Sequence, residues 1–77
     1  MNIEDWNRAL IWEAKYLIEK KAYGIGSAMQ KIWDRNYPTL ESNNEIDIQE
    51  LRELFWSKGH EELDRFNDEI LRRYENE

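Results

Sequence analysis

Two apolar stripes run along one predicted helix, from Ile3 to Tyr23, and they constrain the fold more than any other feature of the chain. Trp12, Tyr16 and Tyr23 fall together on one side at about 100° per residue. Because a surface helix needs only one apolar face, one stripe must be covered by another part of the chain, by a second copy or by a partner. The opposite side carries a broad arc of seven apolar residues: Ile3, Trp6, Leu10, Ile11, Ala14, Leu17 and Ile18.

Turn-forming residues predict where this helix ends and where the next one lies. Gly24 is expected to end the first helix, since glycine adopts a left-handed backbone without strain. Ser27 is expected to cap a short second helix over about 28–36. Pro38 should end that helix, because a proline disfavours helical geometry at the residue before it.

A third and a fourth helix follow, over about 48–58 and 61–74. Asp47 and Glu50 have the spacing of a capping box, which predicts Asp47 as the N-cap of the third helix. Gly59 is expected to end that helix. Three acid-before-base pairs at i,i+4 predict a solvated, self-paired outer face for the last helix: Glu61/Arg65, Asp68/Arg72 and Glu69/Arg73.

These elements predict an all-α fold for residues 1–77. We expect a compact four-helix domain with a long first helix, a short second helix and a C-terminal αα-hairpin, or three long helices plus one short one. No strand has support from alternating apolar and polar residues. The following side chains are predicted to be buried together: Leu10, Leu17, Ile32, Leu51, Phe55, Phe66 and Ile70.

Composition argues against catalysis. The 77 residues include no cysteine and one histidine, and His60 with Asp64 does not make a closed metal site. We therefore expect no catalytic residues, no cofactor and no metal. No signal peptide or membrane-spanning segment is expected either, and the predicted location is cytoplasmic.

Charge is unevenly distributed along the chain. Residues 1–38 hold six basic and five acidic residues, whereas residues 39–77 hold five basic and twelve acidic ones. An acidic half approaches phosphates poorly, so direct nucleic-acid binding is not favoured. A basic protein partner fits better, and the predicted contact residues form an acidic patch: Glu41, Glu45, Glu50 and Glu53.

The chain resembles nucleic-acid mimics and phage-encoded inhibitors of host defence, which are small, acidic and helical. The likeness is one of composition alone. It implies a non-enzymatic protein that inhibits or regulates a larger partner by occupying a basic, nucleic-acid-binding surface. One alternative is a self-associating structural or regulatory protein with a dimer interface at Trp12, Tyr16 and Tyr23, reinforced by Trp56. A helix-turn-helix nucleic-acid binder, with its turn at Gly59, is a third hypothesis.

Overall fold

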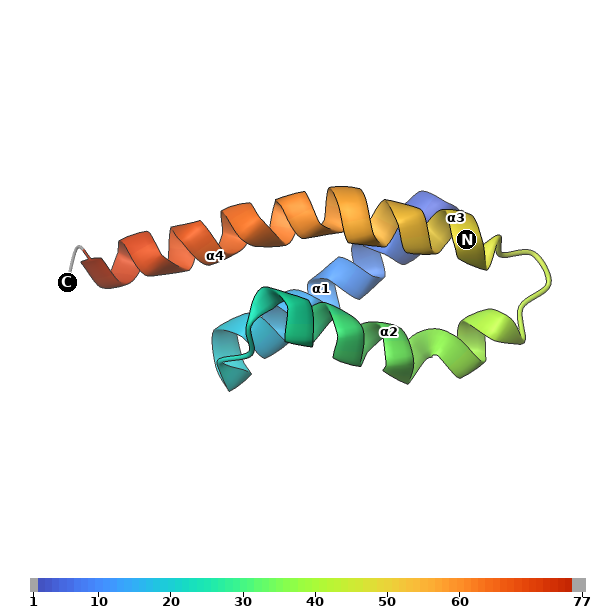
Figure 1. The fold of residues 1–77 in the computed structure, drawn as a ribbon, viewed down its shortest axis with the longest axis horizontal. Coiled ribbons are helices and arrows are strands. Elements are labelled where there is room, and N and C mark those ends of the chain that lie inside the picture. The colour runs from blue at the N-terminus through green and yellow to red at the C-terminus, as the bar shows by residue number, and fades with distance from the viewer. Residues whose placement is uncertain (1, 76–77) are drawn as a thin grey trace.

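The computed structural model describes residues 2–75, which form three helices (Figure 1). Helix α1 spans Ile3–Lys21 and α2 spans Ile25–Glu41. The last helix is 28 residues long and contains a bend. It consists of α3 (Ile48–Leu54), a π-helical turn η1 (Phe55–Gly59) and α4 (His60–Glu75). The predicted all-α fold class is confirmed, with three helices in place of the four that the turn residues suggested.

Helix α1 is the central element of an elongated body that measures 48 × 19 × 17 Å. It contacts α2, α3, η1 and α4 (Figure 1). Its N-cap is Asn2, whose Oδ1 accepts a hydrogen bond from the backbone N–H of Asp5 at 2.9 Å. No helix within the described residues combines the length and apolar character that a bilayer span requires.

The link between α1 and α2 differs from the prediction at Gly24. The residue with a left-handed backbone is Ala22, at φ 58°, and it is the C-cap of α1. Gly24 has φ −68° and is the N-cap of α2. Helix α2 therefore begins at Ile25, three residues earlier than predicted. Ser27 lies within its first turn and is not its cap. The first helix is also two residues shorter than predicted.

Helix α2 continues through Pro38 to Glu41, five residues beyond the predicted end. The physical reason lies in the last turn, where Leu40 is completely buried in the core. Burying a leucine stabilises by about 1.5–3 kcal/mol, which offsets the hydrogen bond that proline cannot donate. Packing thus overrides the local preference of the residue before proline.

The αα-hairpin expected at Gly59 is absent, because η1 joins α3 to α4 without a turn. Gly59 is buried, and a Cβ atom there would lie 3.1 Å from Cδ1 of Phe55 and 3.5 Å from Cγ1 of Ile11. Glycine at this position therefore allows α1 to approach the last helix closely. Its role is in packing and not in ending a helix.

The core lies where α1 faces the other two helices. The buried side chains come from all three helices: Leu10, Ile11, Ala14, Leu17, Ile18, Ala28, Met29, Ile32, Trp33, Leu40, Leu51, Phe55 and Leu63. Five of the seven predicted core residues are among them. Phe66 and Ile70 are only half-buried against this core, because α4 projects beyond the ends of α1 and α2 (Figure 1).

The predicted cap of α3 is confirmed. Oδ1 of Asp47 accepts a hydrogen bond from the backbone N–H of Glu50 at 3.1 Å. Ile46 and Leu51, the two positions of a hydrophobic staple, both belong to the core cluster or pack against it. The N-cap and the two staple positions are therefore as predicted, and the reciprocal bond of a full capping box, from the backbone N–H of Asp47 to the side chain of Glu50, is absent among the hydrogen bonds of residues 2–75.

Candidate protein-binding surfaces

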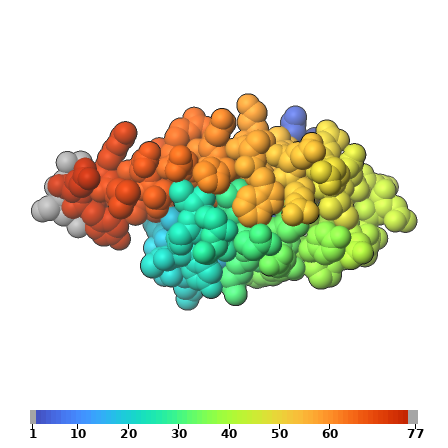
Figure 2. Space-filling view, viewed as in Figure 1, coloured from blue at the N-terminus to red at the C-terminus, as the bar shows by residue number. Residues whose placement is uncertain are grey.

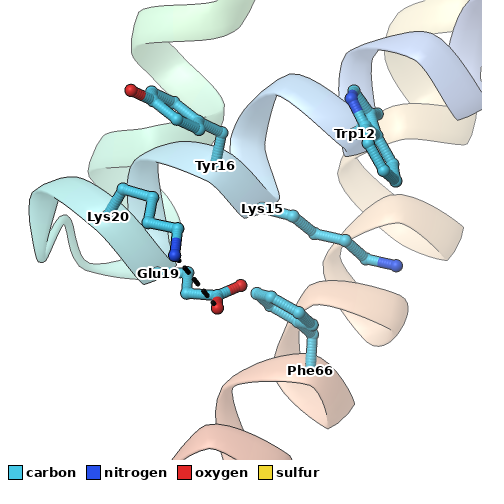
Figure 3. A pocket seen from close by; sticks show the side chains of 6 residues that line it. All are labelled: Trp12, Lys15, Tyr16, Glu19, Lys20 and Phe66. Atoms are coloured by element: carbon cyan, nitrogen blue, oxygen red, sulfur yellow. Dashed lines mark ion pairs between the residues drawn. The ribbon is translucent and has the colours of Figure 1, made fainter.

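The first candidate surface lies on the side of α1 that faces away from the core. Trp12 is 75% exposed and Tyr16, one turn later, is 55% exposed. Both side chains line a groove of about 240 Å³ between α1 and α4 (Figure 3). We call this site the aromatic groove, and its lining residues are Trp12, Lys15, Tyr16, Glu19, Lys20 and Phe66.

The charges around the aromatic groove are paired with one another. Nζ of Lys15 lies 3.6 Å from a carboxylate oxygen of Glu62 and 5.3 Å from the centre of the Phe66 ring. The Glu19 carboxylate lies 3.7 Å from Nζ of Lys20, the pair marked in Figure 3, and 4.0 Å from Nη1 of Arg73. The groove is therefore apolar at its centre and close to neutral at its rim.

The other two residues predicted for this aromatic face lie elsewhere. Tyr23 is half-buried against the core, and its ring centre is 6.0 Å from Nζ of Lys31. Trp56 packs edge-on against Phe55, with ring centres 5.8 Å apart, and lines a separate groove with Gln30 and Arg52. The structure brings Trp12 and Tyr16 together and separates both from Tyr23 and Trp56.

Phe66 is part of the groove but was not predicted as a surface residue. Phe66 was assigned to the core because it continues the apolar stripe of its helix. No sequence signal separates Phe66 from the buried members of this stripe, whereas the structure leaves Tyr74, at its end, 68% exposed. A stripe that runs to the end of a projecting helix need not be covered along its whole length.

The second candidate surface is one end of the molecule, formed by residues 2–8 and 41–53. We call it the acidic end. The last turn of α2, the following loop and α3 meet there (Figures 1 and 2). The first turns of α1 join them, because Glu4 and Asn7 line a shallow groove together with Leu54. All four residues of the predicted acidic patch are exposed: Glu41, Glu45, Glu50 and Glu53.

These four carboxylates have no ion-pair partner within residues 2–75. Glu53 accepts a hydrogen bond from Nε2 of Gln49 at 3.2 Å, and Asp47 is occupied by capping. Across the whole acidic end there are seven acidic residues and two basic ones. Five of the six net negative charges of the chain are therefore at this end.

The acids of α4 do not behave as the i,i+4 spacing predicted. None of the three expected pairs forms an ion pair in the described part of the chain. Arg73 instead reaches Glu19 on α1, and Glu62 pairs with Lys15. Of the six residues in the three predicted pairs, only Arg73 forms an ion pair within residues 2–75, and it does so with another helix. Exposed i,i+4 pairs stabilise by only about 0.2–0.5 kcal/mol, so little is lost when they do not form.

Residues 2–75 contain no group of three or more His, Cys, Asp or Glu side chains arranged to hold a metal ion. His60 is exposed at the start of α4. The chain matches no protein-family model, and comparisons with curated proteins and with solved structures give no match. The two surfaces described above are therefore the observations on which a function can be argued.

Proposed function

We propose that this protein is a non-enzymatic binding protein that inhibits or regulates a larger partner by occupying a basic surface on it. The observation that carries the proposal is the segregation of charge. Five of six net negative charges gather at the acidic end, and the four carboxylates of the acidic patch there are exposed. Complementary charge accelerates association and selects partners of opposite sign.

The favoured target is a surface that normally binds nucleic acid. A DNA duplex carries one negative charge per about 1.7 Å of axis, so five net charges correspond to roughly 8 Å of duplex. The acidic end can therefore replace only a few phosphates, and it suits a small basic site better than a long groove. Repulsion between this end and phosphates argues against direct nucleic-acid binding.

The helix-turn-helix hypothesis loses its geometric basis. It required a turn at Gly59 between two helices, whereas the chain is helical from Ile48 to Glu75. The helix that would enter the DNA groove also begins with Glu61 and Glu62. The phosphate backbone of DNA would repel these two carboxylates.

The test is capture of partners from host-cell extract, with a charge-reversal pair as the comparison. The test variant carries Glu50→Lys and Glu53→Lys, at the acidic end. The matched control carries Glu61→Lys and Asp64→Lys on α4, which are also exposed and change the net charge equally. Wild type and control should retain the same partner, which duplex DNA or RNA should displace, whereas the test variant should lose it.

The kinetics of the captured partner sharpen this test. Reversal at the acidic end should slow association and remove most of its dependence on ionic strength, because steering is screened by salt. Equal association rates for the test variant and the wild type at low salt would show that the acidic end is not the contact surface. Equal losses in both variants would indicate a general charge effect and no specific surface.

A further inference from the structure

The chain exposes two sets of apolar side chains that its own helices leave uncovered. One set is Trp12 and Tyr16 in the aromatic groove. The other is Leu71, 52% exposed, and Tyr74, 68% exposed, on the last turns of α4. Four of the five exposed large hydrophobic side chains in the described residues belong to these two sets. The fifth, Tyr37, lies against the Trp33 ring at 6.4 Å between centres.

The last turns of α4 project away from the body of the molecule (Figure 1). Residues 71–75 are all exposed, and the contact of Arg73 with Glu19 is at the outer limit of an ion pair, at 4.0 Å. We call residues 70–75 the α4 tip. Helical turns without tertiary packing are marginal in water, so the tip gains stability from any surface that covers it.

We propose that a second copy of this chain covers both sets, with the α4 tip of each copy seated at the aromatic groove of the other. A two-fold axis produces this arrangement, since the same two patches then meet twice. The two α4 helices run antiparallel across the axis. The contact uses neither Glu50 nor Glu53, so it is independent of the proposed function.

The spacing of residues along α4 fits an axis that passes near Ile70. Phe66, which lines the groove, and Tyr74, on the tip, each lie four residues from Ile70. Antiparallel pairing about Ile70 therefore places Tyr74 of one copy beside Phe66 of the other, and Ile70 beside its own equivalent. The half-buried stripe of one copy then continues onto the exposed stripe of its partner.

Charge does not oppose this register. Asp68 and Arg72 each lie two residues from Ile70, so at about 100° per residue they point away from the face that carries Phe66, Ile70 and Tyr74. The seam is therefore apolar. Only the C-terminal parts of the two copies overlap, so the two acidic ends lie at opposite poles, where their mutual repulsion is weakest.

The covered area indicates a weak dimer. A Trp or Tyr side chain buries about 150–250 Å² when fully covered. Covering the exposed parts of Trp12, Tyr16, Leu71 and Tyr74 in both copies removes roughly 1,000 Å², the lower limit of specific interfaces. The expected dissociation constant is in the micromolar range, so the dimer should form and separate with concentration.

The test is sedimentation equilibrium of the full chain over a wide concentration range. The mass should rise from the 9.5 kDa of one chain toward twice that value. Tyr74→Ala and Trp12→Ala should each raise the dissociation constant at least tenfold. Tyr37→Ala, which removes an exposed tyrosine outside both sets, should leave it unchanged.

Two outcomes would overturn the proposal: a monomer at every concentration up to the millimolar range, or a dimer that Tyr74→Ala does not weaken. These outcomes leave the proposed function standing, because partner capture reads the acidic end alone. Loss of capture by the Glu50/Glu53 variant with an intact dimer would separate the two surfaces cleanly.

Discussion

The acidic end and the aromatic groove are both exposed, but their exposure destabilises the monomer in different ways. Carboxylates at the acidic end are well hydrated, and their cost is mutual repulsion that salt removes. The 75% exposed Trp12 leaves apolar surface in water, and salt does not remove that cost. The net charge at the acidic end can also be explained by solubility, since charge keeps proteins apart. An apolar groove beside a projecting helix has no comparable role in the monomer.

The largest expected effect separates the core from the groove. Leu51→Ala removes a completely buried side chain and should lower the free energy of unfolding by about 2–5 kcal/mol. Phe66→Ala removes a half-buried ring and should cost about 1–2 kcal/mol, since less area leaves water. Urea unfolding of both variants, at a concentration where the chain is monomeric, measures the difference. Equal losses would mean that Phe66 belongs to the core and that the groove is not open.

A second variant tests how the groove is built. Gly59→Ala places a methyl group 3.1 Å from Phe55 and 3.5 Å from Ile11, which should destabilise by about 1–3 kcal/mol through overpacking. It should also push α1 away from the last helix, because the methyl group meets Ile11 and Asn7 on α1. Thermal unfolding measures the cost, and Trp12 fluorescence in a background of Trp→Phe variants reports the groove.

Gly26→Ala is the matched control for this variant. Gly26 lies within α2, and a Cβ there meets nothing within 4 Å. Alanine should stabilise α2 by about 0.5–1 kcal/mol, because glycine is the poorer helix former. A stabilising Gly59→Ala would contradict the close approach that the structure shows.

Sequence reasoning succeeded where local chemistry decides the structure and failed where packing decides it. The two faces of α1 and the cap at Asp47 follow from periodicity and from one side-chain hydrogen bond. Pro38 and Gly59 were misread, because both were taken as local stop residues. Buried Leu40 carries the helix past the proline, and a close approach of two helices explains the glycine. Neither contact is visible in the order of the residues.

The candidate surfaces show the same division. The exposure of Trp12 and Tyr16 could be anticipated, since a small bundle has few helices available to cover a second apolar stripe on one helix. The separation of Tyr23 and Trp56 from them could not, because it depends on where α2 and η1 pack. The acidic end was found only in part, since the first turn of α1 joins it through the fold and not through the sequence.

The carboxylates at the acidic end differ in their structural role. Asp47→Ala should destabilise by about 0.5–2 kcal/mol, because the backbone N–H of Glu50 loses its acceptor. Glu45→Ala, two residues earlier and exposed, should change the stability by less than about 0.5 kcal/mol. Chemical denaturation of the two variants checks this. If both substitutions cost the same, the acidic end is held together by more of its carboxylates than the structure indicates.

The smallest expected effects have opposite signs in the two regions, which makes them informative. Glu62→Gln removes the partner of Lys15 and should destabilise by a few tenths of a kcal/mol, as for other partly exposed ion pairs. Glu45→Gln removes one of several like charges that have no ion-pair partner in the described residues, and it should stabilise by a similar amount. Both differences should shrink in 1 M salt, where charges are screened beyond about 3 Å. Unfolding curves at low and high salt, with Gln49→Ala as an uncharged reference, measure the signs. A stabilising Glu62→Gln would show that the groove carries excess negative charge, and its rim would then favour a basic partner over a second copy of this chain.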